Sequence, residues 1–201
     1  MMRSVSSLVL AAVLLVSLAA CGGNRRTASS AERPLASLVL KPSEAPAGTR
    51  YVPQLSGPGI LERQGATTEV LNELRSFGFE SDFGRQFYST KPRKGLFSVG
   101  SVAARFRNSE GASKGLGLLQ RELHKVHPLA KPLSVAGLGD EAWGYGGRFF
   151  TNAPSTYRTF YFAWRKDNLI FTVSMSGPKR IVTFRRTVAL ANKIAARSGG
   201  R

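Results

Sequence analysis

The chain has 201 residues, enough for one domain of ordinary size and a leader or tail. Hydrophobic residues make up 42% and charged residues 20%, which permits a packed core and excludes a wholly disordered protein. The formal net charge of +17 is uneven: residues 85–201 hold 21 basic and 5 acidic side chains, whereas residues 1–84 hold 8 and 7. Such a charge attracts polyanions, namely nucleic acid, anionic lipid or acidic cell-wall polymers.

The first twenty residues have the features of a secretory signal. Arg3 precedes a mostly apolar stretch over 5–16, which is shorter than the ~20 apolar residues of a spanning helix. The stretch leads into Leu-Ala-Ala-Cys at 18–21, which resembles the bacterial lipobox, and Cys21 is the only cysteine. We therefore expect a lipoprotein signal peptide over 1–20, a lipidated Cys21, and an exported protein anchored to the cell membrane. The alternative is an ordinary cleaved signal followed by a cysteine without a role.

The rest of the chain divides into a tether and one domain. Residues 21–34 are polar, rich in Gly, Ser and Ala, and aperiodic, so they are expected to form a flexible tether with an r.m.s. span of roughly 20 Å. Residues 35–201 are expected to form a single domain. Its first segment, 35–40, is either a short strand or a helical turn.

Helices and strands alternate through the first half of this domain. A helix is predicted to begin at an N-cap at Thr67 or Thr68 and to end at Gly78. Strands are predicted over 84–89 and 95–106, flanking a turn at 90–95. A second helix is predicted over 108–126, with an apolar stripe formed by Ala112, Leu116, Leu119, Leu123 and Val126.

The second half of the domain carries the clearest pattern. Large apolar residues alternate at 160, 162 and 164 and again at 169, 171, 173 and 175, which predicts a hairpin turning at 166–168. A C-terminal helix over 181–197 has one apolar face, formed by Ile181, Phe184, Val188, Ala191 and Ala195. These elements predict an α+β fold, with an antiparallel sheet of about five to seven strands and two to three helices packed on one face.

The stretch GLGDEAWGYGG at 137–147 is the strongest candidate for a site. Its third glycine is displaced from the dinucleotide-binding pattern, and strand-like residues follow it, so no nucleotide site is expected. Asp140 and Glu141 are adjacent, and on a strand they would point to opposite faces, which does not suit acid and base catalysis. We expect Gly137 and Gly139 to form a turn. Asp140 then either accepts backbone N–H groups in that turn or pairs with a nearby arginine.

No other motif indicates catalysis or a cofactor. The chain has no nucleophile elbow and no phosphate-binding loop. His124 and His127 are three residues apart on the predicted helix, where they are either a pair of metal ligands or, as we favour, cations at the helix C-terminus. We expect no metal, no cofactor and no catalytic residue.

Aromatic and basic residues interleave in the second half and provide the remaining candidates. The candidate ligand-binding residues are Trp143, Tyr145, Arg148, Tyr157, Arg158, Tyr161 and Arg165. Nucleic acid is not expected as a partner of an exported protein, whereas anionic lipid, a cell-wall polymer or a protein partner is. The alternative is that Trp143 belongs to the core and the arginines form a solvated surface.

Four motifs together resemble a group of small secreted lipoproteins and sensor-type extracytoplasmic domains of actinobacterial type. They are Pro-Ala-Gly at 46–48, the passage at 101–112, GLGDEAW at 137–143, and YFAWRKDNLIFTVSMSG at 161–177. The group includes PsbP-like mycobacterial lipoproteins and kinase sensor domains. The resemblance implies an antiparallel sheet with flanking helices and no catalytic residues, although many such domains carry disulfides and this chain cannot.

These observations predict a membrane-anchored, extracytoplasmic and non-catalytic domain of binding or sensor type. Its ligand is expected to be an anionic partner or a small apolar molecule held in a cleft between sheet and helix. Two alternatives stay open: a hydrolase that acts on envelope material, and a purely structural or assembly-partner lipoprotein.

Overall fold

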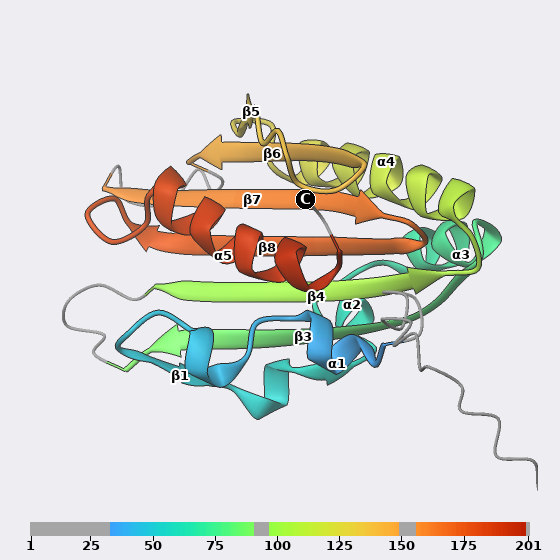
Figure 1. The fold of residues 1–201 in the computed structure, drawn as a ribbon. Coiled ribbons are helices and arrows are strands. Elements are labelled where there is room, and N and C mark those ends of the chain that lie inside the picture. Colours follow the sequence, from blue (N-terminus) through green and yellow to red (C-terminus); the bar gives the residue numbers. More distant parts are fainter. Residues whose placement is uncertain (1–32, 91–96, 149–155, 200–201) are drawn as a thin grey trace, which may run out of the picture.

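The computed structural model describes residues 33–90, 97–148 and 156–199. An antiparallel sheet of eight strands forms the centre, in the order β1-β3-β4-β8-β7-β6-β5, with β2 paired to β3 (Figure 1). The strands are β1 (Thr49–Tyr51), β2 (Gly57–Pro58), β3 (Phe79–Ser89), β4 (Ser98–Phe106), β5 (Lys131–Leu133), β6 (Glu141–Gly147), β7 (Tyr157–Lys166) and β8 (Leu169–Pro178). The predicted α+β class with an antiparallel sheet is confirmed. The strands β1, β2 and β5 have three residues or fewer, too few for a recognisable alternation in the sequence.

Three helices of nine or more residues accompany the sheet. The helices are α1 (Leu35–Leu38), α2 (Ile60–Arg63), α3 (Thr68–Ser76), α4 (Ser109–Val126) and α5 (Phe184–Arg197), with short 3-10 turns η2 (Pro42–Glu44) and η3 (Pro53–Leu55). Side chains cap the three long helices at their start: Thr67 accepts from the Val70 N–H, Asn108 from the Gly111 N–H, and Thr183 from the Arg186 N–H. Local capping therefore fixes where these helices begin.

Helices lie on both faces of the sheet, which corrects the expectation of a single covered face. The helix α5 packs on the face formed by Phe171, Val173 and Met175 of β8. The helices α3 and α4 pack on the opposite face, against Phe106 of β4 and Ile170 of β8. On β4 and β8 this second face mixes small or polar residues, such as Gly100, Ala104 and Thr172, with larger apolar ones, so the sequence shows no regular apolar alternation there.

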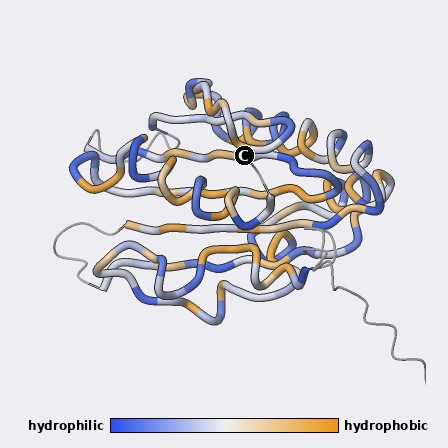
Figure 2. Tube along the Cα trace, viewed as in Figure 1, coloured by the Kyte–Doolittle hydropathy of each residue, from blue (hydrophilic) through white to orange (hydrophobic). Residues whose placement is uncertain are grey.

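The apolar surface of the fold follows this two-sided arrangement. Figure 2 shows hydrophobic stretches along the central strands, hydrophilic residues in the turns, and hydrophobic and hydrophilic residues alternating along the helices. Within α4 the buried apolar positions include Leu118, which lay outside the predicted stripe, whereas Val126 of that stripe is 67% exposed. Phe184 of α5 is 41% exposed, yet its ring lies 5.5 Å from the ring of Phe162.

Several predictions fall on parts of the chain outside the described residues. The predicted signal peptide, Cys21 and the predicted tether up to residue 32 lie there, as do residues 91–96, which include most of the predicted turn. Among the described residues, no helix is long and apolar enough to cross a membrane.

Candidate functional site

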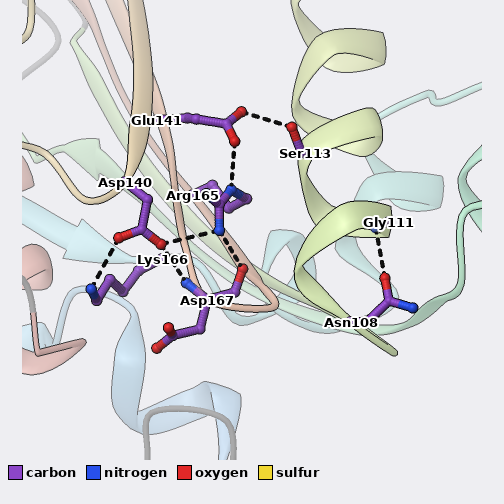
Figure 3. Close-up of polar contacts among 8 residues, drawn as sticks. All are labelled: Asn108, Gly111, Ser113, Asp140, Glu141, Arg165, Lys166 and Asp167. Atoms are coloured by element: carbon purple, nitrogen blue, oxygen red, sulfur yellow. Dashed lines mark hydrogen bonds and ion pairs between the residues drawn. The ribbon is translucent and has the colours of Figure 1, made fainter.

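The adjacent carboxylates Asp140 and Glu141 both bind Arg165 (Figure 3). The Arg165 Nη1 lies 3.0 Å from Asp140 Oδ2, and its Nε lies 2.9 Å from Glu141 Oε1. The expectation that adjacency separates the two side chains is wrong here, because β6 begins at Glu141 and Asp140 precedes the strand. Of the two roles considered for Asp140, the structure shows the pairing with an arginine.

Asp140 also holds the turn of the neighbouring hairpin. Its Oδ2 accepts the Asp167 backbone N–H at 2.9 Å, and its Oδ1 accepts Lys166 Nζ at 3.0 Å. Burial raises the pKa of Asp140, but the hydrogen bond from Asp167 and the charges of Lys166 and Arg165 outweigh it and hold this pKa below its usual value. The same contact with Asp140 raises the pKa of Lys166. Both groups are therefore kept charged and engaged with each other.

The glycines of this stretch make room for neighbouring atoms. A Cβ on Gly139 would lie 2.2 Å from the Arg165 carbonyl oxygen, and the residue has a φ of +71°. Gly144 and Gly146 of β6 pair with Phe162 and Phe160 of β7. A Cβ on either glycine would approach the paired ring to 2.8 Å. The stretch thus serves the packing of the sheet, with Gly137 and Gly139 in the turn before β6.

Three of the aromatic candidates form a cluster beneath α4. The rings of Trp143 and Tyr161 stack with centroids 5.6 Å apart, and Tyr145 meets Trp143 edge-on at 5.7 Å. The Trp143 Nε1 donates to the Leu116 carbonyl of α4 at 3.3 Å. Burial raises the pKa of Tyr161, although a hydrogen bond with Thr172 lowers it in part. These rings pack against α4 instead of forming an open stacking surface.

The basic candidates and Tyr157 lie at two opposite ends of β7. Arg165 is near the β7–β8 turn, whereas Tyr157 and Arg158 lie at the other end of β7, roughly 25 Å away at ~3.3 Å per residue. Arg148 follows β6 at that same far end, because Gly147 pairs with Thr159. The seven candidate residues therefore do not form one site.

A cleft that the motifs did not identify opens between α5, the segment 43–48 and the ends of the central strands. Its volume is about 610 Å³, within the range of ligand pockets. The apolar part of its lining consists mainly of Ala45, Pro46, Phe97, Met175, Ile181 and Leu190. Arg186, Ala189, Leu190 and Lys193 line it from α5 at helical spacing, which places one face of α5 along the cleft.

The segment 43–48 forms the wall of the cleft opposite α5, and contacts with the rest of the domain hold both of its ends. Both oxygens of Glu44 accept Arg197 Nη1, at 3.1 and 2.9 Å. At the other end, the Thr90 N–H donates to the Gly48 carbonyl at 2.8 Å. These contacts join segments far apart in sequence, so the wall is part of the folded structure before any ligand arrives.

The charges at the cleft favour an anion. Arg186 and Lys193 are exposed on the α5 side, and Arg186 Nη1 donates to the Ile181 carbonyl at 2.9 Å. Glu44, the acidic residue among those lining the cleft, is engaged by Arg197. An apolar floor beside two cations suits a ligand with an apolar body and an anionic group.

A smaller hollow and the two histidines near the end of α4 are weaker candidate sites. A smaller hollow of about 370 Å³ lies beside the 132–140 segment, with Trp143 and Gln120 in its lining. The described residues contain no group of three or more His, Cys, Asp or Glu side chains placed to hold a metal ion. His124 stacks on Tyr145 with ring centroids 6.2 Å apart, so this histidine contributes to the cluster beneath α4.

Comparisons with known proteins place the fold but not a family. No family model matches the chain, and no curated protein matches its sequence. The chain is similar to a solved structure, the extracellular domain of PknH from Mycobacterium tuberculosis, with a TM-score of 0.51 and 11% identity. The similarity covers 82% of this chain and 94% of that one. At this identity the likeness shows a shared fold alone.

Proposed function

We propose that this protein is a membrane-anchored, extracytoplasmic and non-catalytic binding domain of sensor type. Its ligand is an amphipathic molecule, with an apolar body in the cleft beside α5 and an anionic group at Arg186 and Lys193. The cleft carries this proposal, because it combines a ligand-sized volume, an apolar lining and two cations at the same helix face.

The proposal that the domain lies outside the cytoplasm rests on the N-terminal sequence and on the fold. The lipobox-like residues 18–21 support export and lipidation at Cys21. The similar solved structure is an extracellular domain, which supports the same side of the membrane for this chain. Together they favour a domain that meets its ligand outside the cytoplasm.

A non-catalytic binding role agrees with the ion pairs that Asp140 and Glu141 already make. Asp140 and Glu141 are bonded to Arg165, and Asp140, which lines the smaller hollow, is also bonded to Lys166, so both carboxylates are engaged by cations. A general acid or base must reach the proton that it transfers, which these contacts oppose. The cleft beside α5 is a different place, and its lining is mostly apolar.

Photo-cross-linking tests the proposal on the full chain in phosphatidylcholine bilayers. The probe is a palmitic acid bearing a photoreactive diazirine, which is both apolar and anionic. Ala189→Trp places a large side chain in the cleft, whereas Ala196→Trp makes the same change at an exposed position of α5 outside its lining. We expect Ala189→Trp to reduce cross-linking at least about five-fold, equivalent to ~1 kcal/mol, and Ala196→Trp to leave it unchanged. Equal cross-linking of the two variants would instead support a structural protein or another site.

A further inference from the structure

One end of the sheet gathers exposed cations from five separate elements. The strand register defines this end: β4 and β8 meet there at Ser98 and Ser176, β7 and β8 at Tyr157 and Pro178, and β5 and β6 at Lys131 and Gly146. We call it the basic end, and its exposed cations are Lys131, Arg148, Arg158, Lys179, Arg180, Arg185 and Arg186. No Asp or Glu lies in its described segments, which are 86–90, 97–100, 129–133, 144–148, 156–160 and 174–186.

The cations of the basic end form a row across neighbouring strands. Lys131 lies on β5, Arg148 directly follows β6, Arg158 lies on β7, and Lys179 directly follows β8. Arg148 and Arg158 flank the last pair of their two strands, Gly147 with Thr159, so the register brings like charges together. Strands are ~4.8 Å apart, which gives the row a length of roughly 15 Å. Like charges across a rung cost stability, and a bound anion would relieve that cost.

The opposite end of the sheet has a different charge balance. There Arg165 and Lys166 bind Asp140 and Glu141. Arg121 binds Glu73, and Lys114 binds Glu110, on the helices that pack near that end. The excess positive charge is therefore concentrated at the basic end and is not spread evenly.

The N-terminal segment enters the domain far from the basic end. The backbone carbonyl of Arg33 accepts Arg105 Nη2 at 2.6 Å. Arg105 pairs with Leu169 at the end of β4 and β8 that lies opposite the basic end. The two ends are roughly 30 Å apart along β7 or β8, whereas the flexible tether expected from the sequence would have an r.m.s. span of only roughly 20 Å. A membrane that holds residue 21 would on average lie away from the basic end.

We infer that the basic end is a docking surface for a linear polyanion, such as a polymer of phosphodiesters or carboxylates, presented from the side away from the anchoring membrane. The row of cations offers several contacts along one line, and a linear polymer can make them together while releasing its counterions. Arg186 lines the cleft as well, but the four cations of the row, Lys131, Arg148, Arg158 and Lys179, do not, so a polymer on the row and a ligand in the cleft are separate occupants. The side from which the polymer comes rests on the membrane anchor of the proposed function, whereas binding to the row does not.

Binding of inorganic polyphosphate to the full chain in neutral detergent tests the inference. The test variant is Arg148→Gln with Arg158→Gln, and the matched control is Arg75→Gln with Arg107→Gln, which removes the same charge from exposed side chains far from the basic end. We expect the basic-end variant to weaken binding about thirty-fold at low salt, which corresponds to ~1 kcal/mol for each of the two cations. The slope of log affinity against log salt should fall by about 1.5, and the control should change little.

Three results would overturn the inference. Equal losses in both double variants would mean that polyphosphate senses only the total charge. Unchanged binding in both would mean that the row is not used. Phosphatidylglycerol vesicles and free polyphosphate can each be added to compete with the bound polyphosphate. If the vesicles displace it at a lower total phosphate concentration than free polyphosphate does, the partner is a bilayer and not a linear polymer. Neither variant should lose thermal stability, because all four arginines are exposed, and removal of the like charges at 148 and 158 should raise the melting temperature slightly.

Discussion

Arg165 and Asp140 are joined twice, once through side chains and once through the backbone. Arg165 Nη1 lies 3.0 Å from Asp140 Oδ2, and the Asp140 N–H donates to the Arg165 carbonyl at 2.8 Å. This double contact ties the turn before β6 to the end of β7. The glycine-rich stretch that most resembled an active site in the sequence is therefore a junction between two strands.

Loss of the Asp140 charge should destabilise the protein. Asn at position 140 would weaken the contacts to Arg165, Lys166 and the Asp167 N–H, at a cost of about 1–2 kcal/mol for a side chain that is partly exposed. Glu141→Gln, whose carboxylate is 43% exposed and has fewer partners, should cost ~0.5 kcal/mol or less. Urea unfolding of both variants measures the difference. Equal midpoints for Asp140→Asn and the native protein would refute the role of this junction.

The stabilisation by Asp140 should depend on pH in one direction. The pKa of Asp140 is lower in the folded chain than in the unfolded one, so its contribution is full above the unfolded value of about 3.9 and is lost as the pH falls through the folded value. The difference in unfolding free energy between native protein and Asp140→Asn should be constant from about pH 5 to 8 and shrink below about pH 4. A difference that grew on acidification would contradict the assigned contacts.

Two glycines of α4 should respond oppositely to alanine. A Cβ on Gly115 would lie 2.5 Å from Cζ of Phe106, which is fully buried, so Gly115→Ala should cost about 1–3 kcal/mol. Nothing lies within 4 Å of a Cβ on Gly117, so Gly117→Ala should stabilise the helix by about 0.5–1 kcal/mol. Thermal melting would show the two shifts. Shifts of the same sign would mean that α4 does not pack on Phe106 as described.

The charge at the cleft should distinguish an acid from its neutral ester. Lys193→Gln removes one of the two cations beside the apolar lining. It should reduce cross-linking of the diazirine palmitic acid several-fold and leave that of the methyl ester unchanged, because only the acid carries a charge. Lys114→Gln, at an exposed position outside both the cleft lining and the basic end, is the matched control. Equal losses for acid and ester would point to a change in the shape of the cleft.

Lipidation should depend on Cys21 alone. Since this is the only cysteine in the chain, Cys21→Ser removes the acyl acceptor without affecting any disulfide. The native protein should appear in the membrane fraction with the added mass of the lipid, and the variant without it. Intact-mass spectrometry of detergent-extracted protein measures this. An unmodified Cys21 in the native protein would exclude the anchor.

Elements with a strong local pattern could be predicted from the sequence. The alternating residues of β7 and β8 indicated their hairpin, and caps such as Thr67 marked helix starts. The covering of both sheet faces could not be predicted, because the second face of β4 presents small residues such as Gly100 and Ala104.

The position of the candidate site could not be predicted, because it depends on contacts between distant parts of the chain. Glu44 and Arg197 are 153 positions apart, and their ion pair helps to form the cleft wall. Asp140 and Arg165 meet because Asp140 lies just before β6, a boundary that the sequence does not mark. No local pattern carries information of this kind. Residue types alone indicated the chemistry of a site but not its position.

The most direct measurement of the central claim is the position at which diazirine palmitic acid attaches to the native full chain. Peptide mass spectrometry after photolysis would identify the labelled residues. The cleft predicts attachment within segment 43–48, at Phe97, or on the 181–193 stretch, with loss of these labels when unlabelled palmitate is added. Attachment concentrated at the Trp143 cluster beneath α4, or spread over the surface without competition, would contradict a ligand site beside α5.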